Sequence, residues 1–112
     1  MVQTETQLRS IVEEYVKLLQ REGITVEKVY LYGSYARGSA HADSDIDLVI
    51  ISKDFDGYDS LELLEMLSQV AWKCDAPLEV LGYTPEEIRK NEGKSIFWDE
   101  IRSTGRILYE AA

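Results

Sequence analysis

Residues 33–50 read GSYARGSAHADSDIDLVI, and this stretch decides the fold of the chain. It begins with a Gly33–Ser34 pair and continues, ten residues later, with the run Asp45-Ile46-Asp47. The segments before the glycine and after the first aspartate are rich in β-branched, aromatic and aliphatic residues, which predicts a strand on each side. A small-residue turn therefore ends one strand, and two carboxylates begin the next.

Hydrophobic periodicity predicts the other elements in the order α-β-α-β-α-β-α-α, followed by a short terminal strand. An acidic loop is expected at 53–59. The expected segments are a helix capped by Thr4 or Thr6 and ended by Gly23, strands at 26–32, 45–51 and 77–83, helices at 34–37 and 61–73, a helix that begins at Thr84-Pro85-Glu86-Glu87, a last helix around 96–101 and a strand at 107–108. This order predicts one α/β domain over 1–112, with helices packed mainly on one face of its β-sheet.

Composition and charge limit the classes of function. The chain is 45% hydrophobic and 29% charged, which is typical of a globular protein, and its net charge is −9. An acidic surface disfavours nucleic acid as a partner and requires that metal ions screen any bound triphosphate. Cys74 is the only cysteine, so we expect no internal disulfide and a cytoplasmic location. No apolar run approaches the ~20 residues of a membrane span, and the first residues lack the pattern of a signal peptide.

The two aspartates form a candidate site for divalent metal. Asp45 and Asp47 are two residues apart on the expected strand, so they share one face, with Cα atoms roughly 6.6 Å apart. Carboxylates placed in this way can share two ions ~3.5–4 Å apart, and Mg²⁺ prefers a few carboxylates together with phosphate oxygens. Without further context, the two aspartates would be interpreted as a solvated strand end. The Gly-Ser turn at a fixed distance from them favours a functional site instead.

The turn supplies candidate phosphate ligands. Gly33 lets the backbone approach a ligand closely, and Ser34 offers a hydroxyl and an N–H group at an expected helix start, where anions bind well. Arg37, one helical turn later, is either a cation for the phosphates or a surface ion-pair residue.

Glu79 is the candidate third carboxylate. It lies in the middle of the expected strand at 77–83, between two residues that should face the core. If this strand neighbours the one that carries the aspartates, Glu79 falls beside them and can bind a metal or help to deprotonate a hydroxyl. The alternative is a surface charge on an edge strand.

The spacing of the Gly-Ser pair and the D-x-D motif resembles the signature of minimal nucleotidyltransferases of the DNA polymerase β superfamily. The fuller form GSYARG…SDIDLVI is similar to the antitoxin members that pair with HEPN toxins. The resemblance implies the polymerase β-like nucleotidyltransferase fold, a small mixed β-sheet backed by helices. It implies transfer of a nucleoside monophosphate from a nucleotide, here ATP, with two Mg²⁺ ions. It also implies that Ser34 holds phosphate, that Asp45 and Asp47 hold both metals, and that Glu79 stands where the family usually has aspartate.

The resemblance implies a hydroxyl acceptor on a partner protein, most simply a tyrosine of a HEPN-type toxin. A non-catalytic antitoxin that inhibits by contact, and a transferase for a small molecule such as an aminoglycoside, are the alternatives, while RNA nucleotide addition is disfavoured by the acidic surface. Val49 and Ile51 continue the aspartate face as apolar residues. We therefore expect this face to be partly open and to dock another protein, in a homo- or hetero-oligomer. The aromatic residues Trp72, Phe97 and Trp98 are interpreted as core or interface residues.

Overall fold

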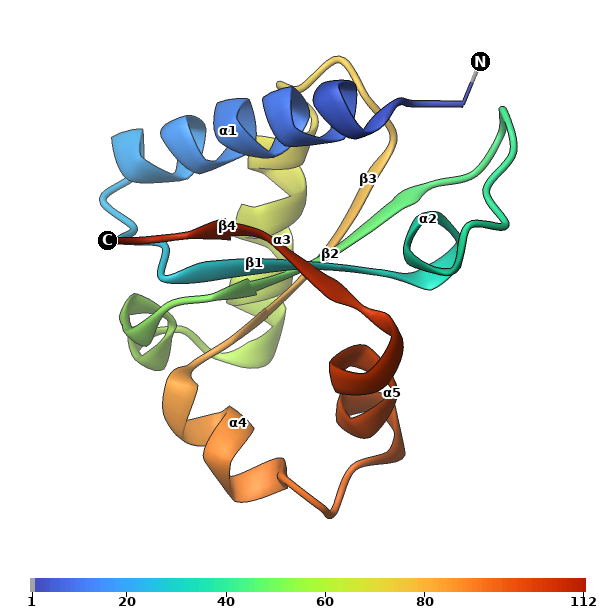
Figure 1. Cartoon of the computed structure of the whole chain (residues 1–112). Coiled ribbons are helices and arrows are strands. Elements are labelled where there is room, and N and C mark those ends of the chain that lie inside the picture. The colour runs from blue at the N-terminus through green and yellow to red at the C-terminus, as the bar shows by residue number, and fades with distance from the viewer. Residues whose placement is uncertain (1) are drawn as a thin grey trace.

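A four-stranded mixed sheet forms the centre of the structure, a computed structural model that describes residues 2–112 (Figure 1). The strands lie in the order β3-β2-β1-β4. Strand β1 pairs antiparallel with β2 and with β4, whereas β2 and β3 are parallel. This arrangement confirms the predicted mixed sheet. The strands are β1 (Lys28–Tyr32), β2 (Ile46–Ile51), β3 (Leu78–Tyr83) and β4 (Arg106–Glu110).

Five α-helices are described, and capping boxes mark where three of them begin. Thr4, Asp59 and Thr84 each form a capping box, in which the cap side chain accepts from a backbone N–H of the first turn and a Glu or Gln side chain accepts from the N–H of the cap residue. The predicted start at Thr84 is confirmed. The helices are α1 (Glu5–Arg21), α2 (Gly33–Arg37), α3 (Ser60–Ala71), α4 (Pro85–Asn91) and α5 (Ile96–Thr104).

The acidic segment after β2 is more ordered than the sequence predicts. A 3-10 helix, η1, occupies Lys53–Gly57, where a loop was expected. The hydroxyl of Ser52 accepts from the N–H of Asp54, and the Asp54 carboxylate accepts from the N–H of Thr25 at 2.7 Å. The Asp54 carboxylate thus pairs with a backbone N–H group. The composition of the segment alone does not reveal this pairing.

Helices α1 and α3 cover one face of the sheet and enclose the main core. Ile46, Leu48 and Ile50 of β2 point into this core and are fully buried. The hydroxyl of Tyr15 in α1 donates to the carbonyl oxygen of Leu67 in α3 at 2.8 Å, which joins the two helices. Among the helices of residues 2–112, none has both the length and the apolar character needed to cross a membrane.

The opposite face carries a second, smaller core beneath α4 and α5 (Figure 1). Val49 and Ile51 are buried there against Trp98 and Ile101 of α5. The two short helices leave the end of this face near Asp47 only partly covered. We expected the sheet face that carries Asp47 to be partly open. It is covered by α4 and α5 at the end away from Asp47 and partly open at the end near Asp47.

Candidate active site

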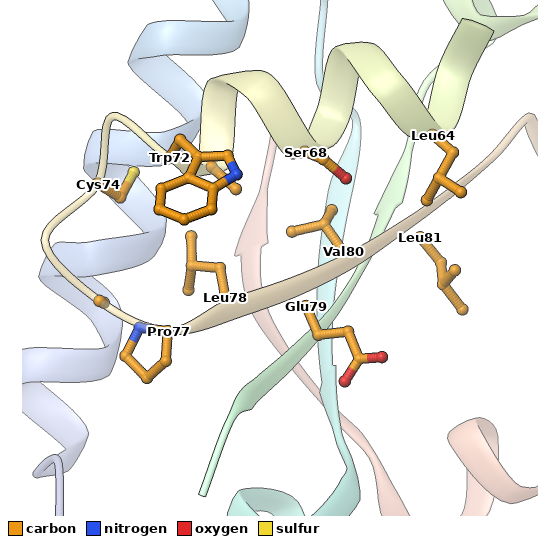
Figure 2. A pocket seen from close by; sticks show the side chains of 11 residues that line it. Leu64, Ser68, Trp72, Cys74, Pro77, Leu78, Glu79, Val80 and Leu81 are labelled. Carbon is orange, nitrogen blue, oxygen red and sulfur yellow. The ribbon is translucent and has the colours of Figure 1, made fainter. Parts of the chain in front are cut away.

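Three polar side chains stand in a row across neighbouring strands at the less covered end of the sheet. Asp47 of β2 lies directly opposite Tyr32 of β1 and directly opposite Glu79 of β3. Residues opposite one another share a face of the sheet, so all three side chains lie on the face away from α3. Figure 2 shows this for Glu79, which points away from α3, whereas Leu78 and Val80 point towards it. The parallel β2–β3 pair therefore brings Glu79 beside Asp47, as the sequence predicted.

Electrostatics couple the two carboxyl groups. Partial burial, a side-chain hydrogen bond with Glu79 and the charges of Glu79 and Asp45 raise the pKa of Asp47 from 3.8 to about 6. The charge of Arg37 acts in the opposite direction. Asp47 thus holds its proton more readily than an isolated aspartate does, because burial and the neighbouring negative charges both disfavour its ionised form.

Tyr32 is a member of this row that sequence reasoning missed. Burial, and then the charges of Asp47, Glu79 and Tyr83, raise its pKa to about 12, so its hydroxyl is neutral at physiological pH. Its ring packs edge-to-face on Phe97 of α5, with centroids 5.4 Å apart. The signal for Tyr32 was its place as the last residue of the strand before Gly33, which puts it at the level of Asp47.

Asp45 lies just before β2, because this strand begins one residue later than predicted, at Ile46. It is exposed, and it contributes charge to Asp47. Among residues 2–112, no three His, Cys, Asp or Glu side chains are arranged as a group that would hold a metal ion. The donors nevertheless fit Mg²⁺ chemically, since they are carboxylate oxygens in a region with excess negative charge.

Gly33 fixes the turn against Asp47. Its φ is +75°, and a Cβ atom at this position would overlap the Oδ2 atom of Asp47 and lie 3.0 Å from its Cγ. Only glycine allows both the backbone conformation and the close approach. Ser34 follows in the first turn of α2, which ends at Gly38 with φ +76°. The turn therefore lies against Asp47, one of the carboxylates predicted to form a site with it.

Arg37, at the end of α2, forms an ion pair with Glu100 of α5, with 3.7 Å between Nη1 and Oε1. Both side chains are about half exposed. The structure thus shows the surface ion pair that was one of the two interpretations of Arg37. The guanidinium remains close enough to Asp47 to lower its pKa.

Trp98 and Trp72 have opposite environments. Trp98 is buried beside Tyr30, edge-to-face with centroids 5.5 Å apart, and its Nε1 has no hydrogen-bond partner among the described residues. Trp72, at the end of α3, is 87% exposed. Of the two interpretations, core or interface, the core one is confirmed for Trp98, whereas Trp72 lies outside the core and its interface interpretation stays a prediction.

Comparison with known proteins gives matches that agree with this geometry. The family described as polymerase beta, nucleotidyltransferase matches residues 13–112. The protein adenylyltransferase MntA of Shewanella oneidensis is 29% identical over 66 residues, which are 59% of this chain and 46% of MntA. The chain thus aligns with less than half the length of that relative.

Two solved structures share the fold. One is a crystal structure of a toxin–antitoxin with AMP-PNP, with a TM-score of 0.61 and 25% identity, and the match covers 88% of this chain and 73% of that chain. The other is a tri-AMPylated Shewanella oneidensis HEPN toxin in complex with an MNT antitoxin, with a TM-score of 0.52 and 18% identity. That match covers 90% of this chain and 73% of the other, and at this identity it shows the fold alone.

Proposed function

Because this chain belongs to the polymerase beta nucleotidyltransferase family, we propose that it transfers AMP from ATP to a hydroxyl group of a partner protein, with Mg²⁺, as the antitoxin of a HEPN toxin. The observation that carries this proposal is the contact between the Gly33–Ser34 turn and Asp47, with Glu79 directly opposite Asp47. A candidate phosphate cradle next to a carboxylate pair is the arrangement that supports binding of a triphosphate.

In the proposed reaction the acceptor oxygen attacks the α-phosphorus of ATP in line with the leaving pyrophosphate. A new P–O bond forms, the bond to the β-phosphate oxygen breaks, and the hydroxyl proton passes to a carboxylate. Glu79, at the exposed side of the row, is the group placed to take that proton. Ser34 would bind the phosphates through its N–H and hydroxyl, and Arg37 would contribute a cation after leaving Glu100.

Asp45, Asp47 and Glu79 are the residues that would hold Mg²⁺. Bound there, the metal would neutralise charge on the triphosphate and on the departing pyrophosphate. Without it, the net charge of −9 on the chain opposes the approach of ATP. The excess of negative charge around Asp47 supports this ligand set.

The acceptor and the partner are proposed from the similar proteins. MntA is named a protein adenylyltransferase, and the HEPN toxin solved with an MNT antitoxin carries AMP groups. We assign the same class of acceptor to this chain and place the reaction in the cytoplasm, where ATP and Mg²⁺ are present.

The proposal is tested by incubating the chain with a candidate HEPN partner protein, Mg²⁺ and ATP labelled at the α-phosphate. Label on the partner protein is the expected result, and ATP labelled at the γ-phosphate should leave the partner unlabelled. Asp47→Asn should abolish labelling, while the matched change Asp43→Asn, in the exposed loop before β2, should preserve it. Tight binding of the partner without any label would instead support a non-catalytic antitoxin.

A further inference from the structure

The outer edge of β3 has no neighbouring strand among the described residues. β3 stands first in the order β3-β2-β1-β4, so only one of its edges pairs with another strand. The N–H of Ile46 donates to the carbonyl oxygen of Pro77, and the N–H of Ser52 donates to that of Tyr83. Backbone groups alternate between the two edges of a strand, so the N–H and C=O groups of Val80 and Gly82 point outward. These groups are available to another strand.

A groove follows this edge beside α3. Two hollows, of about 500 and about 290 Å³, lie between α3 and β3 and share Leu64, Val80 and Leu81. The first extends to Trp72 and Leu78, as Figure 2 shows. Because the two hollows share lining residues, the groove runs along the length of β3.

The helix side of the groove carries an exposed apolar stripe. Leu61, Leu64 and Trp72 lie at helical spacing on α3 and are 65%, 48% and 87% exposed. The charged residues that line the hollows are both acidic: Glu79 in the first and Glu87 in the second. An apolar groove with acidic margins fits a partner with apolar and basic side chains.

We propose that the acceptor protein binds by adding an extended segment to the free edge of β3. Side chains of an added strand alternate between the two faces of the sheet. One set would fill the groove beside Trp72, Leu64 and Leu78. The other set would lie on the face of Glu79, where a residue directly opposite has its Cβ about 4.5–5.5 Å away. The segment that docks therefore also presents its hydroxyl at the carboxylate row.

Charge favours a partner of different sequence over a second copy of this chain. Two copies joined along β3 would bring two acidic margins together, and each chain carries a net charge of −9. The nearby cation Lys73 is already paired with Glu22, with 3.8 Å between Nζ and Oε1. A basic segment meets no such repulsion.

The docking test uses a synthetic peptide of nine residues in which lysine and valine alternate around a central tyrosine. In NMR spectra of the ¹⁵N-labelled chain, the largest amide shifts are expected at Val80 and Gly82. Glutamate in place of lysine, or N-methylation of three consecutive central amides, should weaken binding at least tenfold. Equal binding of either control peptide, or shifts centred on another element, would overturn the proposal.

Two exposed apolar residues give a matched pair of variants. Trp72→Ala should weaken peptide binding at least tenfold, whereas Ile96→Ala, at 89% exposed and on α5, should change it less than twofold. Both chains should keep the unfolding midpoint of the parent, because neither side chain is buried. Equal affinities of the two variants would contradict docking in the groove. If the free chain forms a dimer and Trp72→Ala dissociates that dimer, a second copy of the chain occupies the groove.

The identification of the docked segment as the acceptor rests on the proposed function. Docking at the edge of β3 and the transferase activity can nevertheless fail separately. Docking is read from the peptide shifts, and nucleotide binding is read from shifts at Gly33 and Ser34 when AMP-PNP and Mg²⁺ are added. Peptide shifts without nucleotide shifts would leave the groove established and reject the transferase. Nucleotide shifts without peptide shifts would reject edge docking and leave the transferase in place.

Discussion

The Cα of Gly33 and the carboxylate of Asp47 are in direct contact, and no side chain fits between them. This contact ties the turn after β1 to the first residues of β2, the neighbouring strand. Any change that separates the two also separates the candidate phosphate cradle from the carboxylates.

Replacing Gly33 with alanine should abolish nucleotide transfer and destabilise the chain. The new Cβ would displace Asp47, and the positive φ alone costs roughly 1–2 kcal/mol for a residue other than glycine. Gly38→Ala is the matched control, because Gly38 has φ +76° and a Cβ added there would meet no described atom within 4 Å. Urea unfolding should show a loss of about 1 kcal/mol for the control and a larger loss for Gly33→Ala. Equal losses together with full transfer activity in both variants would contradict the role of the contact.

Asp47→Asn should abolish transfer and leave the chain folded. The change removes a negative charge from a site whose carboxyl already resists ionisation, so the free energy of unfolding at pH 7 should stay equal or rise. Circular dichroism and thermal unfolding measure the fold, and the α-phosphate label measures transfer. A folded variant that transfers AMP at the parental rate would remove Asp47 from the site.

Gly105→Ala should destabilise the junction between α5 and β4. A Cβ there would lie 2.5 Å from the carbonyl oxygen of Ile101 and 2.8 Å from that of Leu31, and these backbone atoms cannot turn away. The expected loss is about 1–3 kcal/mol. Gly57→Ala, with open space around it, should change stability by less than about 0.5 kcal/mol. Urea unfolding of the two variants compares them, and similar midpoints would contradict the close packing of Gly105.

Cys74 should react slowly with thiol reagents. It is buried, and burial followed by the charge of Glu14 raises its pKa to about 11. The thiolate is the reactive form of cysteine. With a pKa of about 11 in place of 9.0, the thiolate fraction at pH 8 is about a hundredfold lower. Reactivity should therefore increase with pH up to about 11. Ellman's reagent at pH 8 should modify the native chain at least a hundredfold more slowly than the urea-unfolded chain. Comparable rates would show that the thiol is accessible.

The sequence predicted the elements well where local signals agree. The capping residues Thr4 and Thr84 and the apolar spacing of α1 set boundaries that the structure confirms. Strand ends were less predictable: Val26 is buried and strand-like in type, yet β1 begins only at Lys28. Burial and pairing are separate properties, and residue type reports mainly the first.

Within the candidate site, the sequence predicted that Glu79 would lie beside Asp47 if their two strands were neighbours, and the structure shows that they are. Spacing could not predict the ion pair of Arg37 with Glu100 or the place of Tyr32 in the row. The ion pair depends on how α5 packs across the sheet, and the place of Tyr32 depends on the register of β1 against β2. Both are set by contacts between segments that are distant in sequence. The exposure of Trp72 was hidden for the same reason, since its place at the end of α3 does not show which side faces solvent.

The parallel pairing of β2 with β3 also has a kinetic consequence. Asp47 and Glu79 are 32 residues apart in the chain, and a parallel pair needs the whole crossover through η1 and α3 before its two strands can meet. Contacts of such high sequence separation form late and slowly. The two carboxylates therefore become neighbours only after this crossover has closed, so a chain in which β1 and β2 alone had paired would hold its Gly-Ser turn beside Asp47 and no paired acid.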